Sequence, residues 1–191
     1  MNITVYLGAR EGRHPRYREA AEEVGRWIAE NGHTLIYGGS EIGLMGVLAN
    51  TVMEGGGTVI GVEPQFFIDG GFLHPGITKT IPVQTMSERR DRMMEMGDGF
   101  IALPGGAGTL DEISEVIVMA SLGKHDKPCI LYNKDGYYDK LAAFYDQMTE
   151  EGFLSEESRE KIVFADTVDE IDSIFRRKQG TGQKWQCTRK S

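Results

Sequence analysis

Short apolar runs alternate along this chain with longer segments in which apolar residues recur every three or four positions. The short runs are typical of strands buried in a parallel sheet, and the longer spacing is typical of amphipathic helices. The pattern predicts strands at 3–7, 34–37, 58–62, 100–103, 129–132 and 162–164. It predicts helices at 15–31, 44–53, 87–96, 137–151 and 169–177, and another that carries Ile113, Val116, Ile117 and Ala120. This alternation indicates an α/β fold with a Rossmann-like, doubly wound parallel sheet and helices on both of its faces.

The alternation continues to residue 177 without a linker-like change of composition, so we expect a single domain over residues 1–177. The segment 178–191 is polar and is expected to be a mobile tail. Within the domain, the stretch 63–85 contains repeated proline and glycine, and no regular element is predicted for it. A long irregular connection inside a compact domain is more often functional than idle.

Composition excludes several classes of protein. The net charge of -8 argues against a nucleic-acid surface, which needs a basic stripe that phosphates can neutralise. The cysteines are Cys129 and Cys187, too few for a disulfide framework or a zinc quartet, and metal-binding spacings are missing, so we expect no metal or organic cofactor. No apolar run approaches the roughly 18 residues of a membrane helix, and the expected location is the cytoplasm.

The most informative stretch is 103–112, Leu-Pro-Gly-Gly-Ala-Gly-Thr-Leu-Asp-Glu, which connects a predicted strand to a predicted helix. Glycines allow backbone N–H groups to approach an anion, and a helix N-terminus adds unpaired donors and a positive dipole end. The third glycine of the dinucleotide fingerprint and the Gly-Lys-Ser/Thr step of the P-loop are both missing, so a monophosphate fits best. The turns at Gly8, Gly38 and Gly105 should share one edge of the sheet, where ligands of such folds bind.

Two motifs together carry a resemblance to a known family. Pro104 to Glu112 resembles the PGGxGTxxE motif, and Met86 to Arg90 resembles the MxxRK motif, of the LOG (lonely guy) family of cytokinin riboside 5′-monophosphate phosphoribohydrolases. The resemblance spans about residues 2–176. It continues in Gly38-Gly39, in Gly43-Leu44-Met45-Gly46, in Gly136-Tyr137-Tyr138-Asp139 and in Glu151-Gly152-Phe153.

The resemblance implies hydrolysis of the N-glycosidic bond of a nucleoside 5′-monophosphate to the free base and ribose 5-phosphate. It assigns catalysis to Arg89 and Glu112, and it implies a homodimer as the minimal unit. The expected partner is a small-molecule nucleoside monophosphate, and the charge and the short apolar runs argue against nucleic acid and membrane. Substrate binding is implied for Arg90 and for Gly105, Gly106, Ala107, Gly108 and Thr109. The pair Gly38 and Gly39 is at least a tight turn, with substrate binding as a second role.

Glu112 has two interpretations. A carboxylate beside the anomeric carbon would stabilise the positive charge that develops on the sugar as the glycosidic bond breaks. Alternatively, Thr109 and Glu112 have the spacing of a capping box, with Thr109 as the N-cap residue. The spacing by itself leaves both open, and the resemblance favours catalysis.

Arg89 and Arg90 lie on the side of their predicted helix that also carries its methionines, whereas Glu88, Asp91 and Arg92 point away. Two arginines on an apolar face need an anionic partner, because an unpaired buried charge is costly. The partner could be a structural carboxylate, or it could be substrate oxygens or Glu112, and we favour the second for Arg89. Arg90 replaces the lysine usual in the family.

The chain departs from the family pattern in places that affect specificity. Gly8-Ala9-Arg10 replaces Gly-Ser-Ser in the first turn, Ser87 replaces a histidine, and Glu63 occupies a normally apolar position. We therefore expect AMP or a related purine monophosphate as substrate, with a cytokinin nucleotide less favoured.

Two other functions were considered. A non-catalytic nucleotide-binding or carrier protein could use the same glycine loop. A lysine decarboxylase would need a pyridoxal phosphate lysine, for which Lys79 and Lys124 have no supporting context.

Overall fold

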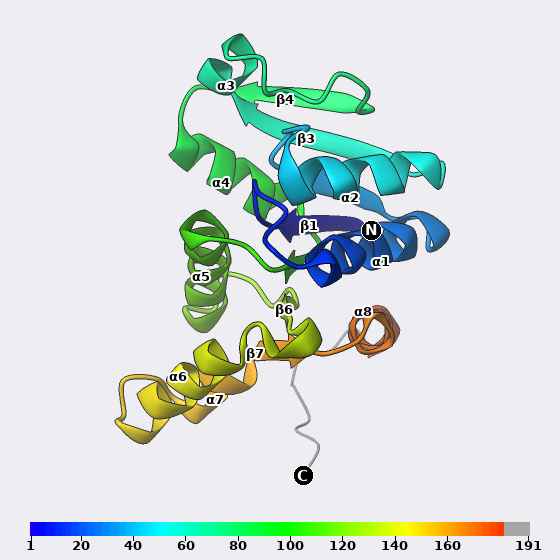
Figure 1. Ribbon diagram of the computed structural model, residues 1–191. Coiled ribbons are helices and arrows are strands. Elements are labelled where there is room, and N and C mark those ends of the chain that lie inside the picture. Colours follow the sequence, from blue (N-terminus) through cyan, green and yellow to red (C-terminus); the bar gives the residue numbers. More distant parts are fainter. Residues whose placement is uncertain (182–191) are drawn as a thin grey trace.

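The computed structural model describes residues 1–181 of the chain, which form a sheet covered by helices (Figure 1). The strands are β1 Asn2–Tyr6, β2 Thr34–Tyr37, β3 Thr58–Pro64, β4 Lys79–Val83, β5 Gly99–Ala102, β6 Cys129–Tyr132 and β7 Ile162–Ala165. The helices are α1 Pro15–Glu30, α2 Gly43–Glu54, α3 Gln65–Asp69, α4 Met86–Met96, α5 Ala107–Ser121, α6 Asp139–Glu150, α7 Glu156–Glu160 and α8 Val168–Thr181, with a 3-10 turn at Lys134–Gly136.

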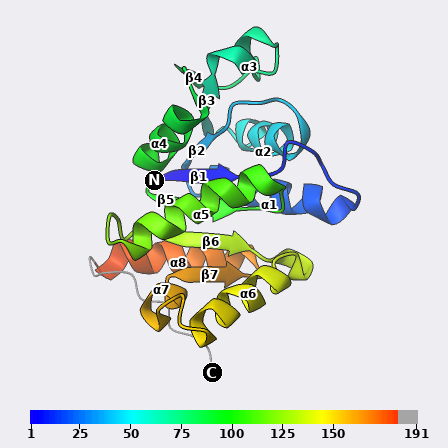
Figure 2. The same ribbon diagram turned by 90° about the vertical axis from the view of Figure 1, so that its left-hand side faces the viewer.

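All strand pairs within residues 1–181 are parallel, and the sheet order is β4-β3-β2-β1-β5-β6-β7. Figure 2 shows this order from top to bottom. The chain adds β2, β3 and β4 on one side of β1, and then returns through α4 to place β5 on the other side. A switch point of this kind leaves a crevice at the carboxyl ends of the two central strands, here β1 and β5. The predicted doubly wound parallel sheet is confirmed.

Each face of the sheet has its own apolar core. Residues of α1, α2 and α8, such as Ile28, Leu48 and Ile171, pack on one face, and residues of α4, α5 and α6, such as Met93 and Ile113, pack on the other. Burying an aliphatic side chain of this size contributes about 1.5–3 kcal/mol. The central strands are apolar on both faces, which is why they read as continuous apolar runs in the sequence.

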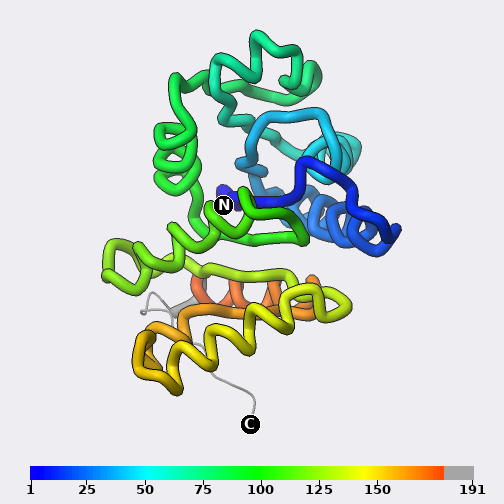
Figure 3. The backbone as a smooth tube through the Cα atoms, turned by 60° about the vertical axis from the view of Figure 1, so that its left-hand side comes forward, coloured from blue at the N-terminus to red at the C-terminus, as the bar shows by residue number. Residues whose placement is uncertain are grey.

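The segment 63–85 is more regular than its sequence predicts. It contains the end of β3, the short helix α3 and the edge strand β4, in which Pro82 lies opposite Glu63. Proline is compatible with an edge strand because such a strand has a partner on one side only. Figure 3 shows this segment at one end of the molecule and α6 and α7 at the other. The five-residue helix α7 was also not predicted.

At the other end of the chain, α8 continues to Thr181, so the first four residues of the segment expected to be a polar tail are helical. The Lys178 ammonium group binds the Asp126 carboxylate at 2.6 Å. Residues 182–191, on which the rest of the tail prediction falls, lie outside the described part of the chain. Among the helices of residues 1–181, none is both long and apolar enough to span a membrane.

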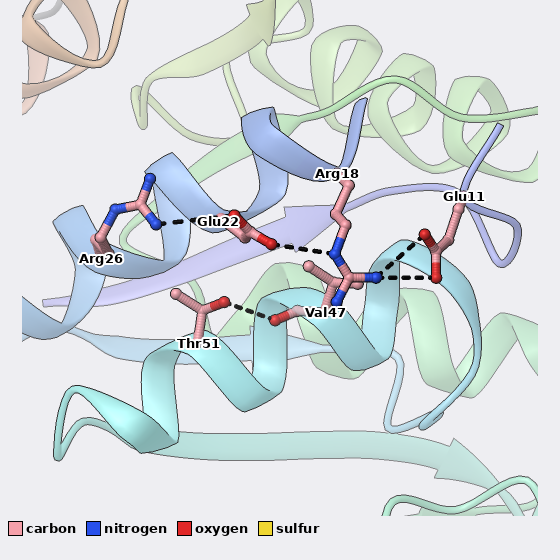
Figure 4. A network of polar contacts seen from close by, with 6 residues as sticks. All are labelled: Glu11, Arg18, Glu22, Arg26, Val47 and Thr51. Carbon is pink, nitrogen blue, oxygen red and sulfur yellow. Dashed lines mark hydrogen bonds and ion pairs between the residues drawn. The ribbon is translucent and has the colours of Figure 1, made fainter. Parts of the chain in front are cut away.

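The loop after β1 is tied to α1 by a network of charged side chains. Arg18 contacts the Glu11 carboxylate at 3.2 Å and the Glu22 carboxylate at 3.1 Å (Figure 4). These side chains are substantially exposed, so water and salt screen the attraction within each pair. Residues 8–12 of this loop line the site described next.

Candidate active site

A cavity of about 500 Å³ opens at the carboxyl ends of the central strands. The turns after β1, β2 and β5 meet there, and Gly8, Gly38 and Gly105 all line it. This confirms the expectation that the three glycine turns share one edge of the sheet.

The helix that follows the glycine loop begins earlier than the predicted capping box requires. Helix α5 starts at Ala107, its N-cap residue is Gly106, and no side chain caps it. Thr109 is therefore the third residue of the helix, and the capping-box interpretation of Thr109 and Glu112 is wrong. The N–H groups of the first turn are free of side-chain caps, so this helix end retains its capacity to bind an anion.

A side-chain cap does form at the start of α4, where it sets the position of the two arginines. The Thr85 hydroxyl accepts a hydrogen bond from the Glu88 backbone N–H at 3.1 Å, and the Glu88 carboxylate accepts one from the Gln84 N–H at 2.8 Å. This reciprocal arrangement fixes the first turn of the helix. Arg89 lies in that turn and is buried, as the helical pattern predicts.

Hydroxyl and amide groups donate hydrogen bonds to the backbone carbonyl groups at the start of the glycine loop. The Tyr137 hydroxyl donates to the Gly105 carbonyl at 2.5 Å, the Tyr138 hydroxyl donates to the Leu103 carbonyl at 2.7 Å, and the Gly8 N–H donates to the Pro104 carbonyl at 3.2 Å. The two tyrosines belong to the Gly-Tyr-Tyr-Asp segment noted in the sequence, but no role was predicted for them. The match of this segment to the family pattern was the feature of the sequence that could have indicated a role for them.

Arg89 connects three parts of the site. Its Nε donates to the Val62 carbonyl at the end of β3 at 3.1 Å, and its Nη1 lies 3.6 Å from Glu112 Oε1. A Cβ atom on Gly38 would lie 1.7 Å from Nη2 of Arg89, so a side chain at this position would displace the guanidinium group. Three kinds of partner were expected for Arg89: a structural carboxylate, substrate oxygens or Glu112. The structure shows the ion pair with Glu112.

The environment of Glu112 favours its neutral form. Its side chain is 12% exposed, and burial raises its pKa to about 6. The positive charges of Arg89 and Arg90 act in the opposite direction, and the neighbouring Asp111 carboxylate raises the pKa further. A carboxyl group with such a pKa can exchange a proton near neutral pH, which is the property required of a group that acts in acid–base chemistry.

Arg90 has structural partners on α5. Its Nε binds the Glu115 carboxylate at 2.8 Å, and its Nη1 lies 3.5 Å from the Asp111 carboxylate. The structure thus shows the ion-pair alternative for Arg90. Because Arg90 also lines the cavity, its substrate-binding role stays a prediction.

Most of the predicted site residues meet at the cavity. Those that line it are Gly38, Arg89, Arg90, Gly105, Gly106, Gly108, Thr109 and Glu112, whereas Gly39 and Ala107 are not among the lining residues. The cavity is also lined by residues that were not predicted for the site, among them Arg10, Tyr17, Met45 and Tyr137. Arg10 belongs to the turn after β1, where this chain departs from the family pattern. That departure was the feature of the sequence that could have indicated its place in the site.

The chain resembles known proteins in sequence. A family model described as "Possible lysine decarboxylase" matches residues 45–174. A Rhodococcoides fascians protein named cytokinin riboside 5′-monophosphate phosphoribohydrolase is 42% identical over 163 residues, covering 85% of this chain and 82% of that protein. A rice (Oryza sativa subsp. japonica) protein of the same name, with the suffix LOG, is 43% identical over 169 residues, covering 88% of this chain and 70% of that protein. The chain belongs to the LOG family.

Solved structures agree with this fold. A molybdenum cofactor binding protein from Rippkaea orientalis superposes with a TM-score of 0.71 at 22% identity, covering 93% of this chain and 96% of that one. The molybdenum cofactor carrier protein of Chlamydomonas reinhardtii gives 0.70 at 21% identity, with 92% and 96% covered. At these identities the likeness shows the fold alone.

The matching family model is described as a possible lysine decarboxylase, and the residues that line the cavity can be compared with what that reaction needs. Within residues 1–181, no lysine lines the cavity. A pyridoxal phosphate enzyme needs a lysine there to form the Schiff base. The residues present do not fit that cofactor.

Proposed function

We propose that this protein hydrolyses the N-glycosidic bond of a nucleoside 5′-monophosphate, AMP or a cytokinin riboside monophosphate, and releases the free base and ribose 5-phosphate. The observation that carries the proposal is the pairing of Glu112 with Arg89 inside a cavity that also contains an uncapped helix N-terminus. The names of the sequence relatives support the same chemistry.

The substrate phosphate would bind at the start of α5. The glycine loop supplies backbone N–H groups there without a competing side-chain cap, and Gly105 and Gly106 line the cavity. Arg10 lines the same cavity from the first turn, and it makes no hydrogen bond or ion pair with any other part of the described chain. Its charge is thus available to an anionic substrate.

Glu112 would act at the sugar. As the bond between the anomeric carbon and the base breaks, its electron pair leaves with the base and positive charge develops on the ribose ring. The ionised Glu112 carboxylate stabilises this charge and orients a water molecule, whose oxygen bonds to the anomeric carbon. The proton lost by the water passes to the Glu112 carboxylate, and the neutral carboxyl group then gives this proton to the departing base, which leaves Glu112 ionised again.

Arg89 would keep Glu112 available for this role. Its guanidinium opposes the effect of burial on the Glu112 carboxyl and so favours the ionised form at neutral pH. Its fork of N–H donors also suits the hydroxyl oxygens of the ribose. Met45, Met86 and Met93 line the cavity as well, and their adaptable side chains suit contact with a purine ring.

The test is incubation of the pure protein with AMP, GMP, CMP and isopentenyl-AMP, followed by separation of the products. We expect adenine and ribose 5-phosphate from AMP. A protein that binds AMP tightly but leaves the bond intact after long incubation would instead be a carrier. Absence of base release from every nucleoside monophosphate tested would overturn the proposal.

We also propose that the protein is a homodimer, with α5 at the interface. Apolar side chains of this helix and its C-cap residue are exposed: Leu110 near its start, Val118 at 53%, and the C-cap Leu122 at 66%. Exposed apolar side chains that share one element are typical of protein–protein contacts. Light scattering on the purified protein tests the oligomeric state.

A further inference from the structure

The charged side chains around the cavity balance only when Arg10 is counted. Those that line it are three carboxylates and three guanidinium groups, namely Glu11, Asp111 and Glu112, and Arg10, Arg89 and Arg90. Without Arg10, the lining would carry one more negative than positive charge. Such a lining would repel a phosphate dianion, so the charge of Arg10 decides how well the cavity suits a nucleotide.

Two of the three arginines are engaged by carboxylates of α5. Arg89 lies 3.6 Å from the Glu112 carboxylate, and Arg90 binds the Glu115 carboxylate at 2.8 Å. The side chain of Arg10, by contrast, makes no hydrogen bond or ion pair with any residue of the described chain. It is exposed, so its charge stays hydrated while the site is empty. Arg10 is therefore the cavity arginine that can pair with a ligand without first losing a protein partner.

The acidic residue next to Arg10 does not neutralise it. The two carboxylate oxygens of Glu11 both accept hydrogen bonds from Nη1 of Arg18 at 3.2 Å (Figure 4). Arg18 belongs to α1 and does not line the cavity. Glu11 is thus paired on the side of α1, and the positive charge of Arg10 is left to the cavity.

The backbone of Arg10 is packed between two glycines. A Cβ atom on Gly43, at the start of α2, would lie 2.6 Å from the Arg10 nitrogen. A Cβ atom on Gly8 would lie 2.9 Å from the Arg10 carbonyl oxygen and 3.4 Å from the Cα atom of Gly105. The Arg10 side chain therefore starts from a backbone position beside the glycine loop.

We propose that Arg10 is a specificity-determining residue, which binds the 5′-phosphate of the substrate and makes the site select nucleotides over uncharged nucleosides. The inference rests on the proposed function, in which the phosphate binds at the start of α5. Arg10 and the backbone N–H groups of that helix would then approach the same phosphate from the turn after β1 and from the glycine loop. The guanidinium fork of Arg10 suits paired phosphate oxygens, and an uncharged nucleoside gains nothing from it.

The test compares the binding of ribose 5-phosphate and of adenine, which has no phosphate, to the wild type and to Arg10→Ala. Isothermal titration calorimetry measures both affinities. We expect the variant to bind ribose 5-phosphate about 10- to 100-fold more weakly, because a charge-assisted hydrogen bond is lost. We expect its affinity for adenine to stay within about twofold of the wild-type value, because adenine has no group that pairs with Arg10.

The matched control is Arg13→Ala, which removes the same charge from an exposed position of the same loop that is outside the cavity lining. We expect it to bind ribose 5-phosphate as the wild type does. Arg10→Lys keeps the charge without the fork, and its loss should be smaller than that of Arg10→Ala. Circular dichroism and thermal melting check the fold of each variant. Wild-type affinity in Arg10→Ala, or an equal loss in Arg13→Ala, would overturn the inference.

Kinetics separate this inference from the proposed function. We expect Arg10→Ala to raise KM for AMP about tenfold or more and to keep kcat within about threefold, because the phosphate contact is present before and during the reaction. A wild type that releases base while Arg10→Ala keeps its KM overturns the inference alone. A wild type without base release overturns the proposed function, and AMP, which then stays intact, is titrated into the same proteins to decide the role of Arg10.

Discussion

At the scale of single residues, Glu112 lies in a site that favours its neutral form, while the proposed reaction uses its charged form. Burial raises its pKa to about 6, and Arg89 limits the rise. Burial destabilises the ionised carboxylate, but it also strengthens the electrostatic interaction of that carboxylate with a nearby positive charge, as the proposed reaction requires. Since α5 begins at Ala107, the Glu112 carboxylate is not engaged as a helix cap.

The first prediction follows from this position. We expect Glu112→Gln to lower kcat for AMP about 100- to 1000-fold, because the developing positive charge on the ribose loses its carboxylate. The rate of adenine release measures the effect. The control is Glu115→Gln, one turn further along α5 and outside the cavity lining, for which we expect a loss of less than about tenfold. Full activity in Glu112→Gln would return Glu112 to a structural role.

The second prediction concerns the stability of the same variant. The pKa of Glu112 is raised on folding, so its contribution to the free energy of unfolding is fully present below about pH 4.5 and is lost as the pH rises through about 6. Glutamine resembles the neutral form at every pH. Relative to the wild type, Glu112→Gln should therefore gain about 2 kcal/mol between about pH 4.5 and about pH 7.5. Urea denaturation at both pH values measures the change, and a constant difference would contradict it.

At the scale of elements, the strand β5, the glycine loop and helix α5 form one unit whose shape depends on individual glycines. A Cβ atom on Gly105 would lie 2.1 Å from the Thr109 hydroxyl oxygen and 3.0 Å from the Gly8 nitrogen. A Cβ atom on Gly108 would meet nothing within 4 Å. The loop therefore requires glycine at one position and only tolerates it at the other.

This difference gives the third prediction. We expect Gly105→Ala to lower the free energy of unfolding by about 1–3 kcal/mol, because the loop and Thr109 must move apart. Gly108→Ala, at a helical position with open space around it, should be neutral or stabilising by up to about 1 kcal/mol. Urea denaturation compares the two variants, and equal effects would show that the loop adapts to a methyl group.

At the scale of the whole molecule, the exposed apolar residues of α5 lie on the face of the sheet that also carries α4 and Arg89 (Figures 1 and 2). A second subunit bound there would cover these side chains. The interface proposed above is therefore close to the site in the fold, and its loss can be measured separately from the chemistry.

The fourth prediction tests that interface. We expect the double variant Val118→Asp and Leu122→Asp to be monomeric while the wild type is dimeric, because charges on both side chains would be desolvated at the contact. Light scattering measures the molar mass. Phe153→Asp is the matched control, since Phe153 is 88% exposed but lies in the loop after α6. A dimeric double variant would show that the interface lies elsewhere, and a monomeric wild type would contradict the proposed dimer.

The alternation of apolar runs and periodic helices was enough to determine the doubly wound parallel sheet and the buried face of α4 that carries Arg89. These features follow from local periodicity, because burial on one face of a helix or within a parallel strand repeats at short spacing. The glycine loop was equally visible. Its residues are adjacent in the chain, so a local motif is enough to identify it.

Other features depend on contacts between residues that are distant in sequence, and only the tertiary structure shows them. Edge strand β4 forms because β3 lies beside it, and α5 begins at Ala107 because Gly105 packs on Thr109 and Tyr137 holds the loop. The pKa of Glu112 and the neighbours of Arg89 depend on burial by the assembled fold. A sequence pattern can place a charged residue on a face, but the free energy of that charge is set by the groups that the fold brings around it.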